Sequence, residues 1–499
     1  MNANLYALLA SHFPDGSAPC LVLTGQADRT IDYAQIADDS ARIANALVAA
    51  GCEPGDRVAV QVEKPWQVLP LYLGTLRAGL VYLPLNSAYQ RGELEYFFAD
   101  ASPRVIVCAP ERLGTIETIS HGATVLTLDA NGGELWARAQ ASSATFKTVQ
   151  RAPDDLAAIL YTSGTTGRSK GAMLTHRNLA SNAVTLVSAW GFTRGDVLIH
   201  ALPIYHVHGL FVALHCALLS GCRVLWMAKF DAKEVLRVMP RATAMMGVPT
   251  FYTRLLAEPA LDRATCAGMR VFIAGSAPLL AETFREFEAR TGHQVLERYG
   301  MTETGMNASN PLLGMRKPGC VGPPLPGVSI RVVGADGKGR AAGTIGEIEV
   351  RGPNVTPGYW NQPDKTSESF TPDAWFRTGD LGTYDADGYL SIVGRAKDLI
   401  ISGGLNIYPK EIEEHLDAMT GVEESAVIGI PDPDFGEAVV AVVVAHPGHS
   451  LEEAQMIAAL KSQIASFKVP KRIVFAAELP RNAMGKVQKS ALRERFARG

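Results

Sequence analysis

Several features that define other protein classes are missing from this chain of 499 residues. Its seven cysteines include no Cys-x-x-Cys pair and no cysteine–histidine pattern with metal-ligand spacing, which argues against a fold built on disulfides or zinc and favours a reducing compartment. No apolar run reaches the roughly 18 residues that a membrane-spanning helix needs. The first sixteen residues lack the basic and apolar segments of a secretory signal. We therefore expect a cytoplasmic protein without stable membrane insertion.

The charge balance is close to neutral. The chain carries 47 Lys and Arg residues against 50 Asp and Glu residues, a formal net charge of −3 at pH 7. A net charge this small offers no broad basic surface, so no nucleic-acid partner is expected. Because a single core rarely grows beyond about 300 residues, at least two domains are expected. The sequence leaves the oligomeric state open.

Helical and strand-like patterns alternate through the first two thirds of the chain. Residues 28–51 repeat apolar positions at helical spacing and end at a glycine, and alternating strand and helix patterns follow. A second alternating series runs from about 172 to 301. This predicts an α/β fold, with a large N-terminal portion of βα-type sheets covered by helices on both faces. The polar stretch Asn131–Gln150 is predicted to be a surface connection.

The last third has a different pattern. Between about 321 and 392, apolar residues alternate on a two-residue period and Asp-Gly pairs mark turns, which predicts a β-rich subdomain. Beyond 398, about a hundred residues carry helix and strand patterns of their own. We expect an N-terminal domain over 1–394, a hinge at 395–397, and a small mobile α+β domain over 398–499.

One stretch, Tyr161–Gly171, is dense in phosphate-binding chemistry. It reads YTSGTTGRSKG and follows the apolar run Leu156–Leu160, which is typical of a buried strand. Glycines allow backbone N–H groups to crowd an anion, hydroxyls add donors, and Arg168 and Lys170 balance negative charge. Such clusters are often solvated loops, and the spacing is not that of a Walker P-loop. Their position directly after an apolar strand favours phosphate binding.

Three further polar clusters follow predicted strands, where open α/β sheets bind ligands. They are GSAP at 275–278, YGMTET at 299–304, and RTGD at 377–380 completed by GRAKD at 394–398. Each cluster alone is explained as well by a cap or a solvated turn. Chance does not readily produce all of them in this order behind the phosphate loop.

In this order the clusters resemble those of the acyl-adenylate-forming superfamily, which includes acyl-CoA synthetases, luciferases and the adenylation domains of peptide synthetases. The similarity extends from about residue 28 to 488 and implies ATP, CoA, Mg²⁺ and a small carboxylic acid as bound molecules. The implied ATP-binding residues are Thr162, Ser163, Gly164, Thr165, Thr166, Gly167, Lys170, Gly275, Ala277, Tyr299, Asp380, Arg395 and Lys486. The other implied roles are catalysis for Thr302, Glu303 and Lys486, Mg²⁺ binding for Glu303, the hinge for Lys397, and CoA binding for Gly403 and Gly404.

The residue types suit that reaction. A carboxylate must attack the α-phosphate of ATP, and the two groups repel each other. Mg²⁺ on Glu303 and the cation of Lys486 offset the negative charge that concentrates in the transition state, and Thr302 can bond the phosphoryl oxygen. Pyrophosphate then leaves, and the CoA thiol attacks the acyl-adenylate.

Within the superfamily, the segments ALPIYHVHGL, GVPTFYTRLL and RYGMTETGMNASNP resemble the malonyl-CoA synthetases. This implies ligation of malonate to CoA through malonyl-AMP, with release of AMP and pyrophosphate. The helix PTFYTRLL lines the acyl pocket in acyl-CoA synthetases, so Arg254 is expected to be buried there and to bind the second carboxylate. The alternative is that Arg254 lies at the surface or pairs with Glu258 one turn later.

The rest of the expected malonate site consists of His208, Ser276, Met306 and Val207. Met306 is the expected pocket floor, although a core methionine would give the same signal. The malonyl enzymes carry threonine at the position of Val207, which leaves malonate and methylmalonate as alternatives. Two further alternatives are another short acid and an adenylation module that loads a carrier protein. The segment ALPIYHVHGL lacks the aspartate with which peptide synthetases anchor an amino acid.

Overall fold

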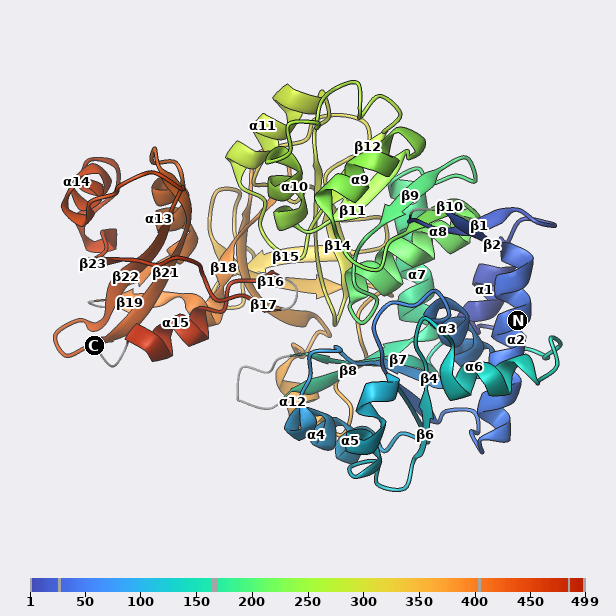
Figure 1. Ribbon diagram of the computed structural model, residues 1–499. Helices are drawn as coiled ribbons and strands as arrows, with labels where there is room; N and C mark the ends of the chain where they lie inside the picture. The colour runs from blue at the N-terminus through green and yellow to red at the C-terminus, as the bar shows by residue number, and fades with distance from the viewer. Residues whose placement is uncertain (1, 26–27, 163–168, 403–404, 483–484, 497–499) are drawn as a thin grey trace.

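The computed structural model describes residues 2–25, 28–162, 169–402, 405–482 and 485–496, whose strands form four sheets (Figure 1). The first sheet has the order β14-β13-β12-β11-β9-β10-β1-β2. Its neighbours are parallel except for the antiparallel edge pairs β1–β2 and β13–β14. The bounds are β1 Pro19–Leu23, β2 Arg29–Asp32, β9 Val197–His200, β10 Arg223–Trp226, β11 Ala244–Gly247, β12 Val271–Ala274, β13 Leu296–Met301 and β14 Gly305–Ser309.

The second sheet has the order β6-β5-β3-β4-β7-β8. It is parallel except for β8, which returns antiparallel to β7. The bounds are β3 Arg57–Gln61, β4 Val81–Pro84, β5 Val105–Cys108, β6 Thr124–Thr127, β7 Leu156–Thr162 and β8 Lys170–Thr175. The two largely parallel sheets confirm the predicted α/β class.

Helices fill the space between these two sheets and cover their outer faces (Figure 1). One apolar core takes in strands of both sheets, and all nine residues from Val68 to Leu76 of one helix are buried in it. The N-terminal helices are α1 Leu5–Ala10, α2 Tyr33–Ala49, α3 Val68–Arg77, α4 Arg91–Ala101, α5 Leu113–Glu117, α6 Gly133–Gln140, α7 His176–Ala189, α8 Leu214–Ser220, α9 Ala232–Val238, α10 Pro249–Leu256 and α11 Ala281–Thr291. A π-helix, His208–Ala213, runs directly into α8.

The last third of the chain forms two smaller sheets. The antiparallel sheet β15-β16-β17-β18 has the bounds Ser329–Val333, Gly346–Arg351, Phe376–Tyr384 and Leu390–Arg395, with α12 Pro363–Glu368 between its strands. The C-terminal sheet joins β19 Ile400–Ser402, β20 Leu405–Ile407, β21 Val422–Asp432, β22 Gly436–Ala445 and β23 Arg472–Phe475, and its helices are α13 Pro409–Asp417, α14 Glu453–Gln463 and α15 Lys489–Phe496. This unit has an apolar core of its own and lies to one side of the molecule (Figure 1). The expected domain limits and the hinge at 395–397 remain predictions.

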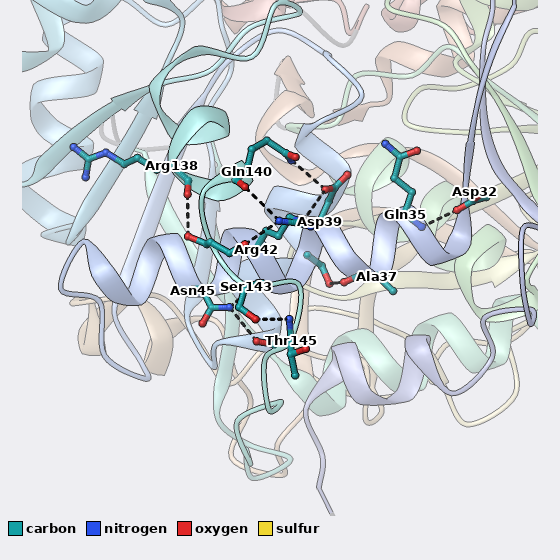
Figure 2. A network of polar contacts seen from close by, with 12 residues as sticks. Asp32, Gln35, Ala37, Asp39, Arg42, Asn45, Arg138, Gln140, Ser143 and Thr145 are labelled. Atoms are coloured by element: carbon teal, nitrogen blue, oxygen red, sulfur yellow. Dashed lines mark hydrogen bonds and ion pairs between the residues drawn. The ribbon is translucent and has the colours of Figure 1, made fainter.

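The stretch Asn131–Gln150 is more ordered than its composition predicts. It contains α6, and its chain is fastened to the polar side of α2 (Figure 2). Arg42 donates to the carbonyl oxygen of Ser142 at 2.9 Å, and Asn45 donates to that of Ser143 at 2.9 Å. The segment lies at the surface, as predicted, and side chains of α2 supply hydrogen bonds that hold it. Among the described residues, no helix is both long enough and apolar enough to cross a membrane.

Candidate active site

The predicted ligand loops all follow strands of the two large sheets or lie in the small antiparallel sheet. β7 ends at Thr162, β12 ends just before Gly275, and β13 ends just before Thr302. Ala277 and Thr302 are half-buried, and Lys397 is exposed in a single 3₁₀ turn, Ala396–Asp398. The predicted residues Ser163, Gly164, Thr165, Thr166, Gly167, Gly403 and Gly404 lie outside the described residues.

The buried carboxylate of Asp380 contacts two other predicted ATP-binding residues, Tyr299 and Arg395. Tyr299 donates its hydroxyl to Oδ2 of Asp380 at 2.5 Å, and Arg395 contacts Oδ1 of the same carboxylate at 2.7 Å. β17 and β18 place Asp380 opposite Arg395 in register, which explains the pairing. Burial, with the neighbouring charge of Asp380, raises the pKa of Tyr299 well above its ordinary value. The tyrosine thus stays a donor and the carboxylate an acceptor, as recognition of ribose hydroxyls requires.

Glu303 is buried beside the end of β7. Its Oε1 accepts hydrogen bonds from Tyr359 at 3.0 Å and from Thr162 at 3.3 Å. The amine of Lys170 lies 4.8 Å from the centre of the Tyr359 ring. The sequence did not predict a role for Tyr359, because a single aromatic residue in a loop forms no recognisable motif.

A permanent metal cage is not part of this arrangement. Within the described ranges, no three His, Cys, Asp or Glu residues gather in a way that could hold a metal ion. A single buried carboxylate is what a Mg²⁺ site needs when the metal's other ligands are phosphate oxygens and water. Glu303 fits that case.

Lys486 reaches this site from the C-terminal unit. Its backbone exchanges two hydrogen bonds with Asn482. The side chain keeps contact with solvent, yet protein on the inner side desolvates its amine enough to lower its pKa. The positive charges of Arg395 and Arg298 lower this pKa further, and the carboxylates of Asp380 and Glu303 oppose them. The lysine therefore lies within electrostatic reach of both Asp380 and Glu303.

Arg298 is the most unusual group in the site, and the sequence reasoning missed it. It is 4% exposed, and among the described residues its Nε and Nη2 atoms have no hydrogen-bond partner. Burial lowers its pKa to about 9. Gly275 lies against the guanidinium so closely that any side chain there would overlap it. The available signal was a charged residue inside the predicted strand β13, directly before Tyr299.

His208 stands next to Arg298. Its Nδ1 lies 3.3 Å from Oγ of Ser276, and its Nε2 is buried without a partner among the described residues. Burial, followed by the charge of Arg298, lowers its pKa well below the ordinary value. Ser276 has a φ of 73°, a left-handed conformation that non-glycine residues rarely adopt and that often marks a functional site. His206 is half-buried, and desolvation together with the charge of Lys486 lowers its pKa to about 3.

Val207 and Met306 are both buried around this region. Val207 lines a cavity of about 10 Å³, room for a single water, together with Thr302 and Gly305. Met306 packs against Gly300, and its backbone is held by Asn182 through two hydrogen bonds. The roles of both as acyl-pocket residues remain predictions.

The expected burial of Arg254 is wrong. The buried residues of α10 are Phe251, Tyr252, Leu255 and Leu256, so its apolar face points inward and Arg254 is exposed on the opposite side. The alternative pair with Glu258 is also absent among the described salt bridges. The charge of Arg254 instead lowers the pKa of Arg481, which belongs to the C-terminal unit, although burial is the larger cause.

Comparisons with known proteins agree with this geometry. The profile of the AMP-binding enzyme family matches residues 10–360, and that of the AMP-binding enzyme C-terminal domain matches residues 411–486. A sulfoacetate–CoA ligase of Cupriavidus necator is 38% identical over 98% of this chain and 97% of its own length. A mitochondrial malonate–CoA ligase of Mus musculus is 35% identical, with coverage of 96% and 90%.

Solved structures extend the comparison. The ATP-bound crystal structure of MatB from Rhodopseudomonas palustris is 56% identical, covers 100% of this chain and 99% of its own, and has a TM-score of 0.97. The apo structure of MatB from the same organism, with the same identity and coverage, has a TM-score of 0.86. Over its whole length the chain is therefore more similar to the ATP-bound form than to the apo form. By these matches, which span most of its length, the chain belongs to the AMP-binding enzyme family.

Proposed function

We propose that this protein joins malonate to coenzyme A at the expense of ATP, through a malonyl-AMP intermediate, and releases AMP and pyrophosphate. The relatives include malonate–CoA ligases, and the sequence segments around His208 and Tyr299 resemble that branch. The observation that carries the proposal is the buried, unpartnered guanidinium of Arg298 beside His208 and Ser276.

A buried guanidinium that lacks acceptors would be stabilised by a bound anion. Two of its nitrogen atoms are buried and have no acceptor in the part of the chain that the structure describes, and an unpaired buried charge is strongly unfavourable. A planar carboxylate can accept two parallel hydrogen bonds from such a group. An acid with a single carboxylate places that group at the reacting phosphate and has nothing left for Arg298. The distal carboxylate of malonate would meet this need, and we assign it to Arg298 in place of the exposed Arg254.

The first half-reaction needs the acid and ATP to approach each other. Arg298, His208 and Ser276 would hold the acid with its free carboxylate turned toward the α-phosphate. Asp380, with Tyr299 and Arg395, would hold the ribose. Lys486 would approach the reacting oxygens and offset their charge as the new bond forms and pyrophosphate leaves.

The nucleotide's metal would be held at Glu303. Its oxygen is already oriented by Tyr359 and Thr162, and a hard carboxylate oxygen is the ligand type that Mg²⁺ prefers. When bound with ATP, the metal would neutralise phosphate charge. Lys170, beside the Tyr359 ring, would add a second cation on the phosphate side.

The second half-reaction requires the thiol of CoA to replace AMP on the acyl carbon. In the present arrangement Lys486 occupies the adenylation side of the site, so the C-terminal unit must turn for the thiol to approach. We propose Lys397 as the hinge and Gly403 and Gly404 as the place where the thiol arm enters. The chain segment around Lys397 is exposed, which leaves its backbone free to rotate.

Sulfoacetate is a second candidate substrate. It has the same short body as malonate with a sulfonate in place of one carboxylate, and Arg298 would bind either anion. The sulfoacetate–CoA ligase from C. necator, with its 38% identity, gives this candidate specific support. Methylmalonate adds one methyl group, which the apolar Val207 would tolerate better than a threonine.

Acid-dependent exchange of pyrophosphate into ATP tests the proposal. The purified protein with Mg²⁺ and ATP is given malonate, methylmalonate, sulfoacetate, acetate or propionate in separate reactions. Malonate is expected to support the fastest exchange, and the monocarboxylates should lag by about two orders of magnitude. Faster exchange with propionate than with malonate would refute recognition of a second anion. Transfer to a carrier protein but not to CoA would favour a loading module.

A further inference from the structure

A buried lysine outside the residues assigned to ATP contacts His200, the last residue of β9. Lys64 follows β3, is 6% exposed, and among the described residues forms no salt bridge. Its amine lies 2.8 Å from Nδ1 of His200 and 2.8 Å from the carbonyl oxygen of the same residue. It also lies 4.5 Å from the centre of the Trp226 ring, on which His200 stacks. A lysine buried this deeply without an anion is rare, so its position calls for an explanation.

The other ring nitrogen of His200 connects the lysine to the π-helix. Nε2 of His200 lies 2.9 Å from the carbonyl oxygen of Gly209. Because that partner can only accept, Nε2 carries the proton and Nδ1 accepts from Lys64. The same Gly209 oxygen accepts the backbone N–H of Leu214 five residues later, which is the hydrogen bond that defines a π-turn. Gly209 also packs directly on the backbone of Pro203 and leaves no room for a side chain.

The π-turn determines where His208 points. Single π-turns insert one extra residue into a helix, rotate the residues before them, and occur often at functional sites. His208 is the first residue of this turn, and its ring lies against Ser276 and near Arg298. Just beyond the turn, His215 of α8 forms a hydrogen bond with the hydroxyl of Tyr72 at 2.8 Å, which anchors the start of α8. Lys64, which contacts His200, and Tyr72, which contacts His215, both belong to the part of the chain that forms the second sheet.

We propose that Lys64 is a positioning residue for substrate recognition: through His200 and Gly209 it holds the π-turn that places His208 in the acyl pocket. This inference rests on the proposed function, because it takes the acid to be bound beside His208. Lys64 touches neither ATP nor the acid. Its loss should therefore change recognition of the acid and leave recognition of ATP intact.

The test compares Lys64→Met with Tyr72→Phe as a matched control. Both substitutions remove a buried polar contact between the second sheet's part of the chain and this helix. Lys64→Met is expected to raise KM for malonate about 10-fold or more, with KM for ATP within about twofold of the wild type. Tyr72→Phe is expected to lower the melting temperature without changing either KM. A melting-temperature loss alone in Lys64→Met, or equal KM changes in both variants, would overturn the proposal.

A second pair of variants keeps the test decisive if Lys64→Met does not fold. His200→Gln retains an amide N–H that can donate to Gly209, whereas His200→Leu does not. The glutamine variant is expected to keep KM for malonate within about threefold of the wild type, and the leucine variant to exceed 10-fold. Equal behaviour of the two would contradict the role of the Gly209 hydrogen bond.

A readout without turnover separates this inference from the proposed function. In protein labelled with ¹³C in its histidine rings, the signal of His208, assigned with His208→Gln, should shift in Lys64→Met and stay in place in Tyr72→Phe. That result without malonate activity would refute the proposed substrate and support the positioning role. Malonate activity together with an unchanged His208 signal would support the proposed substrate and refute the positioning role.

Discussion

Replacement of Arg298 by methionine should make the protein more stable and less active at the same time. The pKa of this guanidinium falls from 12.5 to about 9, and burial is the main cause. The group remains charged at pH 7, so the difference corresponds to about 5 kcal/mol of unfavourable charge burial in the protein without substrate. Methionine keeps most of the apolar stem and removes the charge. We expect the free energy of unfolding to rise by about 1–4 kcal/mol.

The effect on activity should depend on the acid. Loss of a charge-assisted, bidentate bond to the distal carboxylate costs about 2–4 kcal/mol, or about 30- to 1000-fold in kcat/KM for malonate. Propionate has no distal charge, so its kcat/KM should stay unchanged or improve in the less polar pocket. Arg298→Lys should restore part of the malonate activity, because a point charge cannot reproduce the planar fork.

Arg254→Met is the matched control, since the same substitution is made at an arginine of the same protein that is exposed on α10. It should change stability by no more than about 1 kcal/mol and leave the ratio of malonate to propionate activity unchanged. Urea unfolding and steady-state kinetics of the three variants give every value needed. Equal losses for both acids in Arg298→Met, or a selective malonate loss in Arg254→Met instead, would refute the assignment of Arg298.

Three further outcomes are expected. Lys486→Ala should slow adenylate formation by about two to four orders of magnitude and leave thiolation of supplied malonyl-AMP nearly intact; equal losses in rapid-quench assays of both half-reactions would contradict this. EDTA should abolish turnover and Mg²⁺ restore it, whereas tightly bound zinc in the purified protein would argue against Glu303 as a site filled with ATP. Burial raises the pKa of Glu297 from 4.5 to about 7, so its stabilising contribution is complete below pH 4.5 and is lost as the pH rises through 7. Relative to Glu297→Gln, the free energy of unfolding of the wild type, measured with urea, should fall by about 3 kcal/mol between pH 4.5 and 8. Parallel pH profiles of the two proteins would refute the pKa shift.

The sequence predicted the layout well where local pattern and spacing determine it. The alternation of apolar helices and strands led to the α/β class, and β7 and β12 end at Thr162 and just before Gly275, at the expected strand-to-loop junctions. The cluster of Tyr299, Asp380 and Arg395 also forms, although β17 and β18 lie about eighty residues beyond β13. The resemblance to the family in the order and spacing of the motifs led to this prediction, because each motif is a contiguous stretch of sequence.

The features that the sequence did not predict depend on contacts between segments that are distant in the sequence. Arg254 was expected in the pocket because the family resemblance implies that its helix lines the pocket, but only the packed structure reveals which face of α10 turns inward. Arg298 was not predicted, because the burial of a charged residue next to a polar motif cannot be read from a sequence. Lys64 and His200 are 136 positions apart, and no periodicity links them. The ordered segment 131–150 was underestimated for the same reason, because α2 supplies its hydrogen bonds.

The most direct test of the central claim is a product analysis of a single reaction with malonate, CoA, ATP and Mg²⁺. Mass spectrometry should find malonyl-CoA, AMP and pyrophosphate in equal amounts, and omission of CoA should leave enzyme-bound malonyl-AMP. Formation of ADP and phosphate would contradict the adenylate mechanism. Absence of malonyl-CoA under conditions in which another acid is converted to its thioester would contradict malonate as the substrate.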